Sequence, residues 1–566
     1  MPFVRKNSHK ILIALGSLIW SLTMVKSGLT YSFGLGFWGA NGHDGIWHLA
    51  VAGQLAKGSF GMPVFAGELI KNYHLGFDLL LAGLFRLTRI PLSVLYFQIL
   101  PPLIALAFGI SLYLFVKDWK GNKSIALIAL FFGYFGGSWG WLVNLFRFGN
   151  FGGESMFWSQ QSISTLINPP YALSLVFLSL ALLSLHRFVV NNRPKYFWLT
   201  AVLFGLLPLI KVYAGLLSLC GLFSVAVYDS LKFRRLKMWK LFAVTAAISA
   251  AVFFPFNRGA AGLIVFKPFW FLDSMLSVSD RLNWPRLFNA LTAYRQTGNV
   301  LKLTLGYAVA LTVFLVGNLG TRLIGLNMFK SFRRFGPMEY FLSTVFLAGF
   351  FVPTAFVQSG TPWNTIQFFY YSLYVMNIFA AVSVFYLLRR LNRRTWQPLL
   401  LSALLLLTIP TTLDSLKHYL PSRPPAMVSR QETEALKFLS GQPRGVIFTY
   451  PVSPDPYAPA PRPLYLYEST AYVSAFSGHP TYLEDTVNLN ITGFNWPLRR
   501  DLSYAFIKQA SVSAALSFIE QNQIRYIYLP DVSKYRPVLS ASQLGGQVIF
   551  ENSQVSVWAV GASGQP

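Results

Sequence analysis

The sequence predicts a multi-pass α-helical membrane protein with a small α/β domain at its C-terminal end. Hydrophobic residues fill 54% of the 566 positions and charged residues only 12%, against about 25% in soluble proteins. Apolar runs recur that are long enough to cross a bilayer as helices. Only nine of the 20 acidic residues lie in the first 400 positions, so the last part of the chain has ordinary soluble character.

The formal net charge of +27 has two explanations. Basic loops on the cytoplasmic side of the helices explain most of it, and attraction for anionic lipid head groups or phosphates is the second. The basic residues punctuate apolar runs and form no soluble basic face, which argues against nucleic acid as a partner. The single cysteine, Cys220, excludes an intrachain disulfide.

The first predicted span is the apolar run at 11–30, which follows Arg5, Lys6 and Lys10. We expect a retained helix with a cytoplasmic N-terminus, because the run can span and no small-residue cleavage site follows. Together with the later runs it predicts about 11–13 transmembrane helices. The later runs are 75–89, 91–116, 124–146, 171–190, 196–228 (one or two helices), 239–256, 303–326, 338–358, 365–388 and 396–412.

Residues 1–420 form the predicted transmembrane domain, which contains three long loops at 31–74, 147–170 and 257–302. The basic N-terminus places the first loop outside. The third contains FKPFWFLDSML, which predicts a short interfacial helix with aromatic anchors. Residues 421–566 form the predicted soluble extracytoplasmic domain.

The C-terminal domain begins after the linker signal PSRPP and shows α/β patterning. It has no nucleophile elbow, P-loop or GxGxxG after a strand, so we expect an acceptor-binding or structural role and no independent catalysis. The predicted elements are helices at 430–439 and 511–521, strands at 444–450 and 524–529, and a closing hairpin at 547–550 and 555–560.

The first long loop holds the main catalytic candidate, Asp44. Asp44, Trp47 and His48 have the spacing of one helix face. Asp44 is either an N-cap aspartate or an exposed carboxylate that acts as general base on an acceptor hydroxyl. Trp47 and His48 are then candidates for sugar or acceptor binding.

Tyr73 and His74 stand at the start of the next apolar run, where a tyrosine is either an aromatic anchor or part of the binding site. Glu68 and Asp78 flank them and are the second-choice acids. Seven scattered histidines and the absence of HExxH and CxxC patterns provide no recognisable metal cluster. We predict no cofactor, although a divalent metal is not excluded.

Lys211 lies deep in an apolar run, and an intramembrane charge points to function. It is a candidate phosphate contact, because a cation stabilises the negative charge of a phosphate. Alternatively, Pro208 splits the run and leaves Lys211 as a snorkelling residue at an interface. Other cations that could meet the phosphate are Arg258, Lys267, Arg281, Arg286 and Arg295.

Trp363, Asn364 and Gln367 precede a predicted helix and offer aromatic and amide groups that suit sugar binding. A position in the aromatic belt is the alternative for the tryptophan. Asn168 and the two prolines after it most simply end a loop and start a helix.

The chain resembles the GT-C superfamily, polytopic glycosyltransferases that use polyprenyl-phosphate-linked sugars. The resemblance is carried by a short first helix, a long external loop with an early Asp, and a Tyr/His-rich start of the second span. It extends to the segments NYHLGFDLLLAGLFRLTRIP, TLINPPYALSL, PLIKVYAGLL, TPWNTIQFFYYSLYV, SAFSGHPTYLE and QIRYIYLP. Members place a catalytic or metal-binding acid in the first external loop, where Asp44 is the matching position. Many have a second acid next to it, whereas this chain has Gly45, which argues against a two-carboxylate metal site.

The resemblance implies transfer of a sugar from a polyprenyl-phosphate donor to an extracytoplasmic glycan, lipid or protein acceptor, by inverting displacement. It implies a multi-pass protein of the cell membrane. A transporter or flippase of a lipid-linked precursor and a non-catalytic scaffold that binds a partner remain the alternatives.

Overall fold

The computed structural model describes residues 2–260, 262–467 and 469–560. It is 64% helical with small sheets, which confirms the predicted class. Contacts divide the chain into two compact units. We call Met1–Thr23, Pro101–Pro255 and Ala261–Leu420 the helical unit, and Met24–Leu100, Phe256–Ala260 and Pro421–Pro566 the mixed unit. The boundary near residue 420 was expected, whereas the grouping of residues 24–100 with the C-terminal segment was not.

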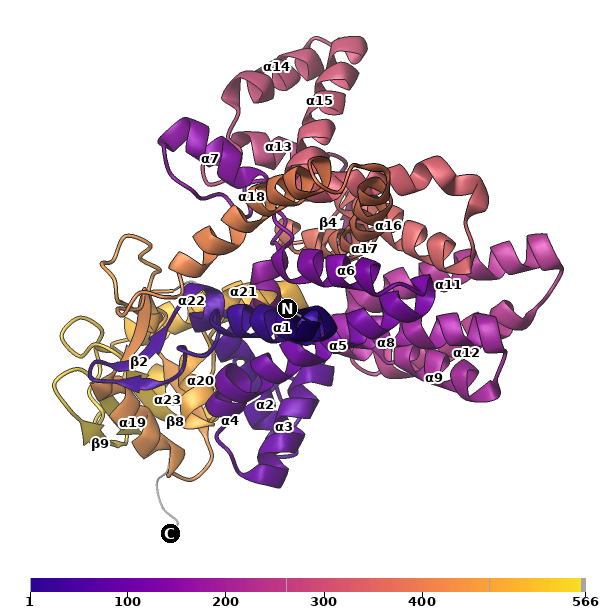
Figure 1. Cartoon of the computed structure of the whole chain (residues 1–566). Coiled ribbons are helices and arrows are strands. Elements are labelled where there is room, and N and C mark those ends of the chain that lie inside the picture. The colour runs from indigo at the N-terminus through magenta and orange to yellow at the C-terminus, as the bar shows by residue number, and fades with distance from the viewer. Residues whose placement is uncertain (1, 261, 468, 561–566) are drawn as a thin grey trace. The chain divides into compact units, whose positions relative to one another are not determined.

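The helical unit consists almost entirely of helices (Figure 1). Its α-helices are α1 (Pro2–Ser21), α5 (Leu100–Lys120), α6 (Lys123–Phe135), α7 (Gly140–Phe148), α8 (Pro169–Asn191), α9 (Pro194–Gly205), α10 (Leu207–Ile210), α11 (Val212–Phe233), α12 (Lys237–Phe253), α13 (Trp270–Ser277), α14 (Pro285–Gln296), α15 (Val300–Leu319), α16 (Pro337–Ala355), α17 (Gln367–Arg390) and α18 (Trp396–Lys417). Its 3₁₀ helices are η3 (Ser162–Ile167), η4 (Gly320–Arg334) and η5 (Pro362–Ile366), and strands β3 (Ile264–Phe266) and β4 (Phe356–Gln358) form a short antiparallel pair.

Helix α17 is the core of this unit, because it packs against α6, α16 and η4. The most apolar stretch of the span Pro362–Arg390, which contains α17, is 78% buried. Its hydrophobic side chains therefore pack mainly against other parts of the protein. The run formed by α15 and η4 is equally apolar but only 28% buried, and residues such as Leu301 are 72% exposed. Apolar surface of this extent is stable facing lipid and not water.

Within the described residues, seven helices are long and apolar enough to cross a membrane, and the bent pair α6 and α7 makes an eighth if it forms one span. This number is smaller than the 11–13 expected. Several predicted spans are short helices, such as α3 (Gly76–Thr88), whose 13 residues reach only about 20 Å against a hydrocarbon core of about 30 Å. The seven are Leu92–Lys120, Pro169–Asn191, Val212–Phe233, Val300–Arg334, Pro337–Ala355, Pro362–Arg390 and Trp396–Lys417.

The structure also differs in detail from the prediction at both ends of the first span and in the third loop. Helix α1 begins at Pro2 and ends at Ser21, ahead of the predicted 11–30. The stretch 257–302 is largely structured, and it contains the expected short aromatic helix as α13. The other elements of that stretch are β3 and α14.

The mixed unit combines two four-stranded sheets with short helices. One sheet has the order β1-β2-β5-β7 and the other β6-β8-β10-β9. Its strands are β1 (Thr30–Tyr31), β2 (Gly34–Phe37), β5 (Ala426–Ser429), β6 (Val446–Thr449), β7 (Arg462–Pro463), β8 (Ile524–Leu529), β9 (Gln547–Glu551) and β10 (Ser556–Ala559). Its helical segments are η1 (Gly39–Gly42), α2 (Asp44–Ala56), α3, α4 (Leu92–Val94), the π-helical η2 (Leu95–Ile99), α19 (Arg430–Ser440), η6 (Leu464–Leu466), α20 (Tyr472–Ser477), α21 (Thr486–Thr492), α22 (Trp496–Ile507) and α23 (Val512–Gln521).

Strand pairing explains why the first long loop belongs to the mixed unit. Strand β2 pairs with β5 in antiparallel register, and Gly34 faces Ser429. The Thr481 amide donates to the Pro63 carbonyl at 2.8 Å. The loop therefore completes a sheet of the C-terminal segment. The predicted helices α19 and α23, strands β6 and β8, and the closing hairpin of β9 and β10 are all present in that segment.

Candidate functional site

The first turn of α2 carries an adjacent His43 and Asp44. Nδ1 of His43 lies 2.5 Å from Oδ1 of Asp44, and the two side chains are 32% and 40% exposed. The N-cap is His43, and Asp44 is the first residue of the helix, so Asp44 is not an N-cap aspartate. A negative charge at this position is favoured by the helix dipole. The site therefore presents an accessible carboxylate with a neighbouring imidazole.

Gly45 explains why a second acid does not follow Asp44. A Cβ atom at position 45 would lie 2.7 Å from Cζ of Phe97 and 3.2 Å from the Tyr96 ring. Both aromatic residues are fully buried. A carboxylate side chain would not fit at position 45 without displacement of this packing.

A buried polar pair lies one helical turn beyond Asp44. Nδ1 of His48 lies 2.7 Å from Oδ1 of Asp78, and both residues are buried. The His48 ring also stacks on Tyr96, with centroids 5.6 Å apart. Asp78, one of the second-choice acids, is thus enclosed and orients His48.

Tyr73 and His74 lie beside this pair. Their rings stack with centroids 4.6 Å apart, and Tyr73 also meets Trp47 edge-on at 5.5 Å. Burial raises the pKa of Tyr73 well above its ordinary value, and the charges of Asp78 and Asp44 add to the rise. Tyr73 is therefore a neutral phenol at physiological pH, which suits hydrogen bonding and not proton abstraction.

Glu68 and Arg258 are exposed members of the mixed unit. Arg258 belongs to the segment Phe256–Ala260, which is anchored by a 2.6 Å bond from the Asn72 amide to the Phe256 carbonyl. Asn72 precedes Tyr73 in the chain. Arg258 is thus a candidate cation on the same unit as Asp44.

Asp485 is a site residue that the sequence did not reveal. It caps α21, with φ 49° and ψ 62°, and it accepts hydrogen bonds from Ser469 at 2.5 Å and from the Asn488 amide at 3.2 Å. Burial raises its pKa, and the nearby His43 opposes that rise. The only available signal was the acidic pair at 484–485.

Lys211 begins a polar network in the helical unit. It stands between α10 and α11 with an extended backbone, as expected if Pro208 splits the run. The side chain is buried and does not snorkel outward. Its Nζ atom donates to Oδ1 of Asn168 at 3.2 Å, and the same oxygen accepts the Tyr171 amide at the start of α8. Asn168 therefore serves as both helix cap and lysine partner.

Two of the predicted sugar-binding residues continue this network. Asn168 donates to Gln367 at 3.4 Å, and Gln367 donates to Asn364. Asn364 donates to the hydroxyl of Tyr213 at 2.9 Å. The structure thus links Lys211 with residues about 150 positions away, which spacing alone does not indicate.

Trp363 and Arg295 take other positions in the helical unit. Trp363 is 46% exposed, which is also typical of a belt residue. Arg295 forms an ion pair with Asp273 at 3.0 Å and contacts the Tyr307 hydroxyl. Its charge is therefore already balanced by a carboxylate.

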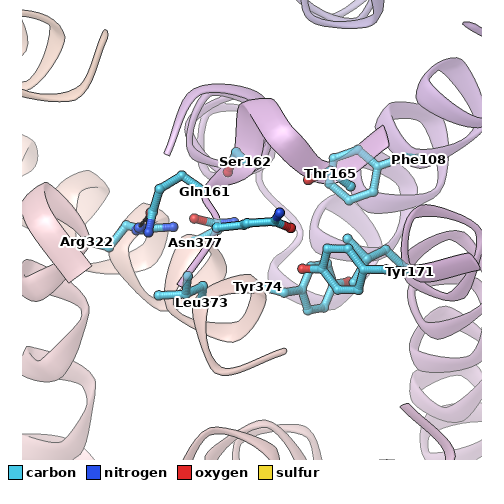
Figure 2. A pocket seen from close by; sticks show the side chains of 12 residues that line it. Phe108, Gln161, Ser162, Thr165, Tyr171, Arg322, Leu373, Tyr374 and Asn377 are labelled. Carbon is cyan, nitrogen blue, oxygen red and sulfur yellow. Dashed lines mark hydrogen bonds between the residues drawn. The ribbon is translucent and has the colours of Figure 1, made fainter. Parts of the chain in front are cut away.

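Arg322 is a fully buried cation in the helical unit (Figure 2). It donates to the Asn318 carbonyl at 2.7 Å, to the Gly137 carbonyl at 3.2 Å, and to the Gln161 side chain. Within the part of the chain that the structure describes, its Nη1 atom has no hydrogen-bond partner. It borders a cavity of about 20 Å³ that Asn377 also lines, which is room for a single water molecule. Lys211 was singled out because it is a charge within an apolar run. The same criterion applies to Arg322, which is the single charged residue of the run 303–326.

Among the described residues, no group of three or more His, Cys, Asp or Glu side chains is placed to hold a metal ion.

No protein-family model and no curated protein matches this sequence. Several solved structures are similar to this chain. The apo oligosaccharyltransferase of Archaeoglobus fulgidus matches with TM-score 0.53 and 12% identity, over 93% of this chain and 70% of that one. The arabinofuranosyltransferase AftD from Mycobacteria matches with TM-score 0.50 and 14% identity, over 99% of this chain and 40% of that one. At such identities the likeness concerns the fold alone, so this chain shares the fold of these two solved structures.

Proposed function

We propose that this protein is a membrane glycosyltransferase that moves a sugar from a polyprenyl-phosphate donor to an extracytoplasmic acceptor. The observation that carries the proposal is the accessible Asp44 at the start of α2, paired with His43, in a chain of GT-C fold. Asp44 also stands where the resemblance to the superfamily expects the acid of the first external loop.

The proposed reaction is a direct displacement. The carboxylate of Asp44 accepts the proton of an acceptor hydroxyl as its oxygen attacks the anomeric carbon. The bond from that carbon to the phosphate oxygen breaks, and the electron pair leaves with the lipid phosphate. Attack from the side opposite the leaving group inverts the anomeric configuration. His43 holds the carboxylate through the Nδ1 contact and acts as a positioning residue.

The donor is a lipid because most of the chain has membrane character and because a related fold binds such a carrier. The Archaeoglobus fulgidus AglB structure contains a dolichol-phosphate and an inhibitory peptide, at 12% identity to this chain. The leaving phosphate requires a cation. Lys211 in the helical unit and Arg258 in the mixed unit are the two candidates. We place the N-terminus in the cytoplasm and the C-terminal segment outside, following the basic N-terminal residues.

The experiment is a transfer assay with purified full-length protein and radiolabelled polyprenyl-phosphate hexoses and pentoses, offered to membrane glycan, lipid and protein fractions. We expect transfer by the wild type and a loss of about 100-fold or more in Asp44→Asn, in line with removal of a general base. Glu434→Gln is the matched control, because Glu434 is an exposed acid of the same unit and is not a candidate site residue.

Three outcomes would contradict parts of the proposal. Full activity of Asp44→Asn would remove the general-base role. Movement of the labelled lipid across liposomes without transfer to any acceptor would favour the transporter alternative. If the protein shows neither sugar transfer nor lipid movement, and its C-terminal segment retains a protein partner, the scaffold alternative is favoured.

A further inference from the structure

A pocket of about 300 Å³ lies within the mixed unit, and Asp485, described above, is part of its lining. It is bounded by the end of β6, the segment 451–454 and the start of α22. Five half-buried aromatic residues line it: Tyr450, Tyr465, Tyr467, Trp496 and Tyr504. Ligand pockets in proteins usually measure roughly 300–1,000 Å³. This pocket is near the lower end of that range, which suits one or two small rings and not a lipid chain.

Buried polar groups complete the lining. Thr470 is 7% exposed, and within the described residues its hydroxyl has no hydrogen-bond partner. Glu484 is also buried, and it accepts hydrogen bonds from the Val473 and Ser474 amides at 3.0 and 2.9 Å. A buried hydroxyl without a partner costs about 1–3 kcal/mol, which a ligand hydroxyl would recover.

The charges of the lining disfavour an ionic ligand. Arg500 is already paired with Asp501 at 3.0 Å, so its charge is not free to bind a phosphate, and the acids of the lining are Glu484 and Asp485. These acids are weak attractors for a cation as well. Burial raises the pKa of Glu484 to about 8, so this carboxyl is mostly protonated at neutral pH. An uncharged polyol remains the ligand class that fits both the rings and the polar groups, because a sugar has apolar C–H faces and hydroxyl edges.

One residue of the pocket lining, Asp485, is influenced electrostatically by His43. His43 in turn contacts Asp44. All of these residues belong to the mixed unit.

We propose that this pocket binds an uncharged sugar ring of the acceptor, with Trp496 stacked on its apolar face and Thr470 bonded to a hydroxyl. The inference rests on the proposed glycosyltransferase function, and it specifies a glycan acceptor. Asp485 has a left-handed backbone, a conformation that Asp tolerates better than most residues.

The test is saturation-transfer NMR on the full chain in a detergent without a sugar head group. The probes are the methyl glycosides of glucose, galactose, mannose and arabinofuranose, with tetramethylammonium and inorganic phosphate as rival ligands. We expect at least one glycoside to bind, with affinity at least tenfold weaker in Trp496→Ala and largely kept in Trp496→Phe. Thr470→Val should weaken binding without a loss of folding. Leu498→Ala is the matched control, because Leu498 is exposed on the same helix and does not line the pocket.

Several results would overturn the inference. The first is that none of the glycosides binds. The second is that Trp496→Ala and Thr470→Val bind glycosides as well as the wild type does. The third is that tetramethylammonium or phosphate binds in the pocket more tightly than the glycosides. Asp44→Asn separates this inference from the proposed function, because it should abolish transfer and leave glycoside binding intact. Glycoside binding without any transfer by the wild type would sink the enzyme proposal alone.

Discussion

Nδ1 of His43 lies 2.5 Å from Oδ1 of Asp44, and this contact joins the N-cap to the first residue of α2. Because the two residues are neighbours, the contact needs no long-range packing to form. Long-range packing decides its surroundings, since Asp485 from a distant part of the chain lies near the same imidazole. The pair therefore combines a local geometry with a tertiary electrostatic environment.

The first prediction concerns His43 as a positioning residue. His43→Ala should lower kcat by about 10- to 100-fold with little change in the acceptor KM, because the carboxylate loses its orienting partner. His43→Gln should recover part of the loss, since its amide can still donate to Asp44. Steady-state kinetics of both variants check this, with thermal unfolding as the folding control. Equal losses in the two variants would contradict orientation through a hydrogen bond.

The second prediction concerns the tight packing at Gly45. Gly45→Ala should lower the free energy of unfolding by about 1–3 kcal/mol, because the added methyl overlaps the Phe97 ring. Gly53→Ala on the same helix is the control, since its Cβ would meet nothing closer than 3.8 Å. That control should be neutral or stabilising by about 0.5–1 kcal/mol. Denaturant unfolding in detergent compares the two, and equal effects would refute the close contact.

The third prediction concerns the buried acid Glu484. Its pKa is raised from 4.5 to about 8 by burial, so between these values the folded protein holds a proton that the unfolded chain releases. Its contribution to stability is complete below about pH 4.5 and is lost as pH rises through about 8. Unfolding midpoints between pH 5 and 9 should thus fall less steeply in Glu484→Gln than in the wild type. Glu434→Gln, a change at an exposed acid, should keep the wild-type slope.

The fourth prediction concerns the donor phosphate. If Lys211 contacts it, Lys211→Met should raise the donor KM about tenfold or more and leave the acceptor KM unchanged. Arg258→Gln tests the other candidate in the same assay. Lys302→Met, a change at an exposed lysine of the helical unit, is the control. A lower unfolding temperature of Lys211→Met without any change in donor KM would assign Lys211 to the polar network alone.

Local patterns were enough to predict many elements. Strand β8 matches the predicted 524–529 residue for residue, because a short run rich in Ile, Tyr and Leu that ends before Pro530 needs no distant partner to be recognised. The break at Lys211 followed from Pro208 in the same way. Fewer helices of the described residues pass a test of length and composition than the apolar runs predict, since runs such as 75–89 form helices shorter than 18 residues.

By itself, the sequence determined the membrane character, the candidate acid Asp44 in the first loop and several elements of the C-terminal segment, because each follows from composition or from neighbours along the chain. Only the tertiary structure decided that β2 completes a sheet with β5, that Lys211 meets Asn168, and that Asp485 lies near His43. Those pairs are separated by tens to hundreds of residues. Their meeting depends on burial and hydrogen bonding summed over the whole fold, which no local pattern of residues encodes.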